Sequence, residues 1–261
     1  MEAKKGRREM KKFELTTEFI TNALGKKLFR IKALVEFGSV KAGELGGYAE
    51  KEENISQDGN AWVSGDARVY GNAWVSGDAR VYGDAWVHGN AKVFGNAEVS
   101  GDARVYGDGW VHGNAKVFGN AEVYDNAKVY GDAKVFGNAK VYGNARVYGN
   151  AWVSGDARVS GDAWVSGNAW VSGNARVSGN ACVSGDADYA LVQGFGTEFR
   201  CTTFYRGKNK KIMVNCGCFH GDLEGFRKQV KETRNGKIAK EYLMIADLME
   251  YHFTSEDSSN E

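Results

Sequence analysis

The chain has 261 residues, 34 of them basic and 33 acidic, so its formal net charge is only +1. This balance excludes the broad positive field that would steer a protein toward nucleic acid, and no stretch is apolar enough for a membrane span. The basic start of the chain lacks the apolar segment of a secretory signal, and four cysteines do not suggest a secreted disulfide framework. We therefore expect a soluble, cytoplasmic protein. The lack of proline suits a body made of hydrogen-bonded strands.

Residues 1–58 are expected to form a basic tail followed by a β cap. Phe13 to Thr17 and Lys27 to Val35 are predicted strands, with a short helical or turn segment at Glu18 to Leu24 between them. The Leu45-Gly46-Gly47-Tyr48 stretch then indicates a first, imperfect coil of the repeat that follows. Because the end of a stack of strands exposes unpaired edges, an atypical capping segment is expected at this place.

Residues 59–188 repeat a six-residue phrase, Gly-(Asp/Asn)-Ala-x-Val-x, without insertion or deletion. Every sixth residue from Val63 to Val183 is valine, and the phrase departs from its own rule at Gly109, which replaces Ala, and at Asp125, which replaces Gly. The alternation points Ala and Val to one side of a short strand. The Gly-(Asp/Asn) pair tolerates positive φ and so allows a sharp corner after each strand. One strand and one corner every six residues predict a solenoid.

The phrase resembles the hexapeptide repeat of left-handed parallel β-helices, which have three sides and eighteen residues per coil. The resemblance implies an all-β solenoid, a left-handed parallel β-helix of about seven coils. At roughly 4.8 Å per stacked strand, the prism would be on the order of 34 Å tall. Its core of Ala and Val leaves no room for a ligand inside, so binding is expected on the outer walls, at the corners or between copies.

The repeat is expected to give way to a small α+β module over residues 189–253 and a disordered tail over residues 254–261. Three segments are predicted to form strands: Tyr189 to Gln193, Glu198 to Arg206, and Lys211 to Phe219. Asp222 can cap a helix that ends at Asn235-Gly236, and a second helix is predicted from Ile238 to Phe253.

The layout of the whole chain resembles hexapeptide-repeat proteins encoded by bacteriophages and prophages. The resemblance is carried by the Leu45-Gly46-Gly47-Tyr48 stretch, by the long repeat, and by the ending Val214-Asn215-Cys216-Gly217-Cys218-Phe219-His220-Gly221-Asp222-Leu223-Glu224-Gly225-Phe226. It implies a phage or prophage origin and, as in most left-handed β-helices, a homotrimer with parallel prisms.

All seven tryptophans occupy the phrase position just before Val and are expected to point outward, each beside a Ser or His two residues later. Elsewhere a cation stands two residues before an aromatic ring, as in Arg68/Tyr70 and Lys92/Phe94, which suits a cation–π contact. An eighteen-residue coil would stack the rings in columns. These columns are Tyr106, Tyr124 and Tyr142 on one side, Phe118 and Phe136 on the next, and Tyr130 and Tyr148 on the third.

These outer groups have two interpretations. They shield the walls of the prism, or they form contact surfaces, because contiguous apolar patches are uncommon on monomers. A flat-ringed ligand such as a nucleotide, or a loop of a host protein, could then sit between a ring and an Arg in the groove between subunits. The candidate binding residues are Arg104, Tyr106, Lys116, Phe118, Tyr124, Tyr130, Lys134, Phe136, Tyr142, Arg146 and Tyr148.

Candidates for catalysis and metal binding are weaker. An acyltransferase of the hexapeptide type would place a His near a loop thrown out of the solenoid, but this repeat has no such loop, and His88 and His112 read as surface residues. No cofactor is expected. Cys216, Cys218 and His220 alternate along a predicted strand with Cys201 opposite, which mimics a zinc set. Because same-face residues on a strand lie about 7 Å apart, buried thiols are favoured over a metal site.

One corner stacks Asp66, Asp84 and Asp102 on successive coils, where like charges repel. Either a bound cation bridges them or Arg68 and Arg104 neutralise them.

The leading hypothesis is a non-enzymatic, trimeric solenoid that acts by binding, for instance an intracellular antagonist of host antiphage defence that sequesters a nucleotide signal or occludes a defence protein. The alternative is a structural or virion-associated scaffold. An acyltransferase is the third hypothesis.

Overall fold

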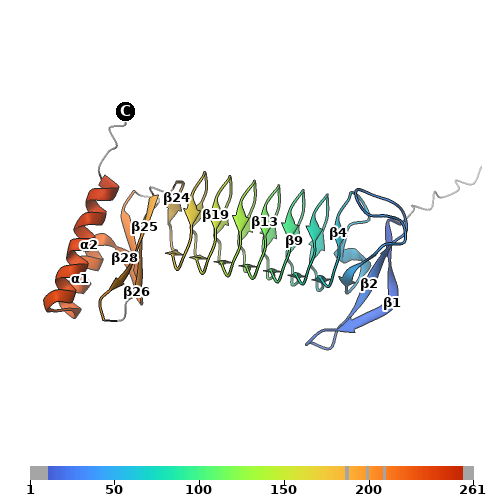
Figure 1. Cartoon of the computed structure of the whole chain (residues 1–261), viewed down its shortest axis with the longest axis horizontal. Helices are drawn as coiled ribbons and strands as arrows, with labels where there is room; N and C mark the ends of the chain where they lie inside the picture. Colours follow the sequence, from blue (N-terminus) through green and yellow to red (C-terminus); the bar gives the residue numbers. More distant parts are fainter. Residues whose placement is uncertain (1–10, 186–187, 198–199, 208–209, 255–261) are drawn as a thin grey trace, which may run out of the picture.

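The computed structural model describes residues 11–185, 188–197, 200–207 and 210–254. Three parts follow one another along the long axis: an N-terminal hairpin, a solenoid, and a small sheet covered by two helices (Figure 1). Most of the predicted N-terminal tail and nearly all of the predicted C-terminal tail lie outside the described ranges. Among the described residues, no helix is long and apolar enough to cross a membrane.

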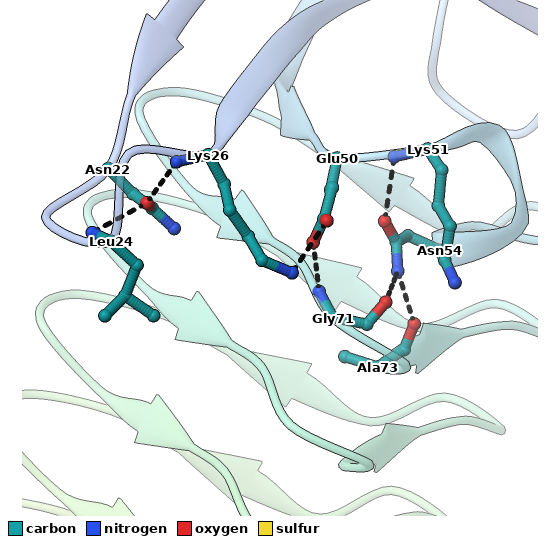
Figure 2. Close-up of polar contacts among 8 residues, drawn as sticks. All are labelled: Asn22, Leu24, Lys26, Glu50, Lys51, Asn54, Gly71 and Ala73. Carbon is teal, nitrogen blue, oxygen red and sulfur yellow. Dashed lines mark hydrogen bonds and ion pairs between the residues drawn. The ribbon is translucent and has the colours of Figure 1, made fainter.

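The N-terminal hairpin pairs β1 (Phe13–Thr21) antiparallel with β2 (Lys27–Ala33). The helical or turn segment predicted at Glu18 to Leu24 is wrong up to Thr21, where β1 ends, whereas a turn does begin at Asn22 and includes Leu24. Asn22 makes this turn: its Oδ1 accepts the backbone N–H groups of Leu24 and Lys26, each at 3.0 Å (Figure 2). Pairing with β2 holds the end of β1 in a strand, and this pairing cannot be inferred from the residues around Glu18 alone.

The hairpin continues into β3 (Leu45–Ala49), which pairs antiparallel with β2 and parallel with β5 of the first coil. The 3₁₀-helix η1 (Glu52–Asn54) follows, and buried Asn54 donates from Nδ2 to the carbonyls of Gly71 and Ala73 at 3.1 and 2.9 Å (Figure 2). Glu50 accepts the Gly71 N–H at 2.6 Å. The cap therefore satisfies backbone groups that the first coil would otherwise expose.

The solenoid consists of two-residue strands in three parallel sheets, and the chain completes about eight turns when β3 is included. The first wall contains β4 (Trp62–Val63), β7 (Arg80–Val81), β10 (Glu98–Val99), β13 (Lys116–Val117), β16 (Lys134–Val135), β19 (Trp152–Val153) and β22 (Trp170–Val171). The second wall contains β5 (Arg68–Val69), β8 (Trp86–Val87), β11 (Arg104–Val105), β14 (Glu122–Val123), β17 (Lys140–Val141), β20 (Arg158–Val159) and β23 (Arg176–Val177). The third wall contains β6 (Trp74–Val75), β9 (Lys92–Val93), β12 (Trp110–Val111), β15 (Lys128–Val129), β18 (Arg146–Val147), β21 (Trp164–Val165) and β24 (Cys182–Val183).

The inside of the prism is a stack of Ala and Val, as the alternation predicts. Every Ala and Val of the phrase from Ala61 to Val183 is at most 1% exposed. The register advances by eighteen residues per coil, so Val111 pairs with Val93 on one side and Val129 on the other. The parallel solenoid and its dry core are confirmed, whereas the left-handed sense implied by the resemblance stays a prediction.

The corners combine glycine with ladders of amide hydrogen bonds. The phrase glycines from Gly59 to Gly179 have φ between 60° and 72°, a region that side chains rarely adopt. At the next position, Asn Nδ2 donates to the Oδ1 of the residue one coil further on. Asn120 donates in this way to Asn138 at 3.0 Å, and Asn138 donates to Asp156 at 2.9 Å. Five ladders of the described residues end at an aspartate, at Asp78, Asp108, Asp132, Asp156 and Asp162, because a carboxylate can accept but not donate.

The two departures from the phrase lie on consecutive coils of one corner. Asp125 occupies a glycine position with φ of 56°, stacked over Gly107. One coil earlier, a Cβ on Gly109 would lie 2.9 Å from the Val123 carbonyl oxygen and 3.0 Å from that of Tyr106. The missing methyl group at Gly109 therefore leaves room below the altered corner.

The C-terminal module contains the antiparallel strands β25 (Tyr189–Phe195), β26 (Arg200–Arg206), β27 (Ile212–Cys216) and β28 (Phe219–Asp222) and the helices α1 (Leu223–Thr233) and α2 (Gly236–Thr254). The helices cover the face of the sheet that points away from the solenoid (Figure 1). The predicted third strand, Lys211 to Phe219, divides at Gly217, whose φ of 60° reverses the chain. The predicted cap is confirmed, since Asp222 accepts the Gly225 N–H at 2.9 Å.

The module covers the last coil of the solenoid. Asn215 donates from Nδ2 to the Arg176 carbonyl at 2.7 Å, and the Tyr205 hydroxyl donates to the Ser178 carbonyl at 3.1 Å. Tyr205 is fully buried and belongs to the solenoid core. The C-terminal end of the stack is therefore closed by hydrogen bonds and by an aromatic side chain.

Candidate functional site

Stacked rings run up all three walls. On the second wall, Tyr70, His88, Tyr106, Tyr124 and Tyr142 form one column with centroids 4.8 to 5.2 Å apart and planes within 8° of parallel. The third wall carries a column of Phe94, His112, Tyr130 and Tyr148, and the first wall carries Phe118 stacked on Phe136 at 4.9 Å. The predicted columns are present, and two of them are longer than expected.

The two wall histidines are members of these columns, a placement that the sequence reading missed. His88 lies between Tyr70 and Tyr106, and His112 lies between Phe94 and Tyr130. Counting eighteen residues from each neighbouring tyrosine would have found them. Burial lowers the pKa of both imidazoles, and the nearby Arg104 lowers the pKa of His88 further.

A lowered pKa makes the stability of the folded chain depend on pH. Near the usual histidine value of 6.5 the unfolded chain binds more protons than the folded chain. The stability that the two neutral imidazoles contribute is fully present above pH 6.5. It is lost as the pH falls below that value toward the pKa of the folded state. We expect the His88→Phe, His112→Phe double variant, which extends the ring type of Phe94, to lose less thermal stability than the parent between about pH 7.5 and about pH 5. Equal losses in melting temperature for both proteins would contradict this assignment.

The cations pair with tryptophans of neighbouring coils, so the predicted contacts within a strand, such as Arg68 with Tyr70, are wrong. Arg68 and Arg104 lie over Trp86 with 5.1 and 4.9 Å from Cζ to the ring centroid. In-register neighbours are about 4.8 Å apart, closer than the roughly 7 Å between alternate residues of one strand. The remaining contacts of this kind on the second half of the solenoid involve Lys128 with Trp110, Lys134 with Trp152, and Arg146 with Trp164.

The candidate lysine Lys116 has a different partner, the Glu98 carboxylate at 3.1 Å. Tryptophan exposure also differs from the prediction at one site. Trp62 is only 5% exposed because Phe13 and Phe37 of the cap pack edge-on against it. Trp170, by contrast, is 50% exposed.

A diagonal contact links neighbouring coils on the outside. The residue after Val reaches the residue before Val on the next coil: the Tyr106 hydroxyl donates to Glu122 at 3.1 Å, and Trp170 Nε1 donates to Ser154 Oγ at 3.1 Å. Burial and the Glu122 carboxylate both raise the pKa of Tyr106. Trp170 therefore bonds to a serine sixteen residues earlier in the chain.

The structure does not bring the four candidate zinc ligands together, and the favoured alternative of buried thiols is wrong for Cys218, which is exposed. The turn formed by Gly217 and Cys218 ends β27 at Cys216, so Cys216, Cys218 and His220 do not alternate along one strand. Burial raises the pKa of the Cys201 thiol. Across the described ranges, no three His, Cys, Asp or Glu side chains gather as a metal site.

At the aspartate corner, Asp66 has a partner that neither prediction named, while a cation bridging Asp66, Asp84 and Asp102 stays a prediction. Asp66 faces Arg30 of the cap, with 3.8 Å between Oδ1 and Nη1. Neutralisation by Arg68 and Arg104 is wrong, because both guanidinium groups lie over Trp86.

The fold defines the class: the chain is a parallel β-solenoid repeat protein. A family model described as the YdcK beta solenoid repeat matches residues 61–77, 73–89, 97–113, 139–155, 151–167, 157–173 and 169–185. These matches lie within the repeat and leave the cap and the C-terminal module uncovered. No curated protein matches the chain.

Proposed function

We propose that the chain is a non-enzymatic binding protein that assembles as a homotrimer through its aromatic walls. The observation that supports this proposal is the column of five rings on the second wall, four of which remain partly exposed. Stacked rings are held rigid, so little side-chain entropy is lost when a partner packs against them. A long apolar surface of this kind is uncommon on a monomer and typical of contact surfaces.

A catalytic role for the wall histidines receives no support from their surroundings. His88 and His112 are sandwiched between rings at 4.7 to 5.2 Å, and the repeat runs without an inserted loop at either place. A ring enclosed in this way stabilises the column rather than presenting a base to a substrate.

The assembly is tested by light scattering. The parent protein should have a mass near three chains of 28.5 kDa, and Tyr124→Ser should reduce the mass toward one chain. Serine occupies the same phrase position at Ser160, so the exchange is compatible with the fold. The matched exchanges Tyr130→Ser and Phe136→Ser on the other walls identify which wall the copies share. A parent protein that is monomeric at micromolar concentration would contradict the proposal.

In keeping with the phage-type resemblance, we place this binding protein in the cytoplasm of an infected host, as an antagonist that sequesters a nucleotide signal or occludes a defence protein. Native mass spectrometry of protein isolated from infected cells should show a retained small molecule or host partner. Purified phage particles should lack the protein. Its recovery from particles would support the alternative, a virion scaffold.

A further inference from the structure

The ring column of the second wall stops below the C-terminal module. Tyr142 is its last ring, and the next two coils carry Ser160 and Ser178 at the same phrase position. These serines, with Asn215, Phe219 and other residues, line a pocket of about 180 Å³ between the wall and the module. The pocket therefore begins where the next ring of the column would lie.

Two exposed arginines flank this pocket. Lys140, Arg158 and Arg176 stand in register on consecutive coils of the same wall. Lys140 is paired with Glu122 at 3.1 Å, whereas Arg158 and Arg176 are exposed, and no carboxylate of the described residues forms a salt bridge with either. Like charges in register on neighbouring strands destabilise a sheet. An anion bound between the two guanidinium groups would remove that repulsion.

The diagonal contacts of the walls show where these guanidinium groups lie relative to the missing ring. Residues sixteen apart meet on the outer surface, as Tyr106 meets Glu122 and Ser154 meets Trp170. By the same relation Arg158 is the diagonal neighbour of Tyr142, and Arg176 is the diagonal neighbour of Ser160. A flat ring seated over Ser160 would thus stack on Tyr142 with a guanidinium group near its edge.

The side of the pocket that belongs to the C-terminal module is held in place by polar contacts. Asn215 donates from Nδ2 to Ser178 Oγ at 3.1 Å and accepts on Oδ1 from His220 Nδ1 at 2.6 Å. Because Asn215 also bonds to the Arg176 carbonyl, this side is joined to the wall that carries the cations. The pocket is thus preorganised, which lowers the cost of ordering it around a ligand.

We propose that this pocket binds a nucleoside monophosphate, with the base stacked on Tyr142 in the place of the missing ring and the phosphate held between Arg158 and Arg176. Two adjacent cations match the charge of a phosphate monoester, and base stacking on an aromatic side chain is sequence-tolerant. The inference deepens the proposed binding function by naming a ligand class, but the site lies within one chain and needs no trimer.

The test is calorimetric titration of the full chain with 5′-AMP. Binding should weaken by about tenfold or more in Arg176→Gln, which removes a charge-assisted hydrogen bond, and should weaken as salt is added. Ser160→Tyr continues the ring column into the pocket, so it should abolish binding without lowering the melting temperature. The matched exchange Ser172→Tyr on the first wall should leave binding unchanged.

Adenosine alone and inorganic phosphate alone should each bind more weakly than 5′-AMP. No binding of 5′-AMP at millimolar concentration would overturn the inference, and so would equal binding by the parent and Ser160→Tyr. A monomer that binds 5′-AMP would support the pocket and contradict the trimer. A trimer that does not bind it would overturn the pocket alone.

Discussion

Val129→Asp is expected to lower the free energy of unfolding by several kcal/mol, because it places a carboxylate in a shaft that contains no polar partner. Val129 is 0% exposed and pairs in register with Val111 and Val147. The neighbouring side chains in the shaft are Ala and Val, so the charge is neither solvated nor paired there. Urea unfolding followed by circular dichroism measures the change in midpoint.

Two control variants separate the effect of burying a polar group from the effect of adding a carboxylate. Val129→Thr keeps the shape of the side chain and buries one hydroxyl, so its cost should be about 1–3 kcal/mol. Ser172→Asp adds the same carboxylate to the outer wall and should change stability by no more than about 0.5 kcal/mol. An unchanged midpoint for Val129→Asp would mean that this valine contacts water, against the structure of the core.

Gly46→Ala is expected to detach the N-terminal cap. A Cβ at this position would lie 2.5 Å from Ile31 Cγ1 and 2.5 Å from the Val63 carbonyl oxygen. The carbonyl belongs to the backbone of the first coil and cannot rotate away, so the overpacking should cost about 1–3 kcal/mol or more. Hydrogen exchange should show faster exchange of the amides in β3, and the exposed strand edge should promote association end to end.

Gly185→Ala is the matched control for this variant. Apart from its chain neighbours, no atom of the described residues lies within 4 Å of a Cβ built on Gly185, so the exchange should be nearly neutral. If the β3 amides are equally protected in the parent and in Gly46→Ala, the cap accommodates the added methyl group with no loss of stability, contrary to the expected clash.

The solenoid was predictable because each six-residue phrase contains the residues that determine its own strand, corner and inner face. Val111 needs no distant information to point inward, and a fixed period sets its register against Val93 and Val129. The ring columns follow from the same period. The phrase could not show that the N-terminal cap covers Trp62, because Phe13 and Phe37 come from a segment without any repeat.

Outer-wall partners were harder to predict than inner ones. Sequence proximity suggested Arg68 with Tyr70, but stacking places Arg68 closer to Trp86 of the next coil. In the C-terminal module, β propensity continued through Gly217, whereas its positive φ creates a hairpin. The Gly217 turn depends on one backbone angle that β propensity does not report, whereas Arg68 is placed by a contact with a chain segment outside the local window. The pocket beside Arg158 and Arg176 has the same origin, since half of its lining belongs to the C-terminal module.

The amide ladders at the corners give the solenoid a polarity along its long axis, which the near-identical phrases do not reveal. A coil with asparagine at a corner requires an acceptor on the following coil, as Asn138 requires Asp156, whereas a coil with aspartate requires none. Every corner of the repeat from Asn60 to Asn180 carries Asn or Asp, so an eighteen-residue unit that is duplicated or deleted leaves an acceptor on the following coil. The length of this protein can therefore change during evolution by whole coils within the repeat while the corner amides keep their partners.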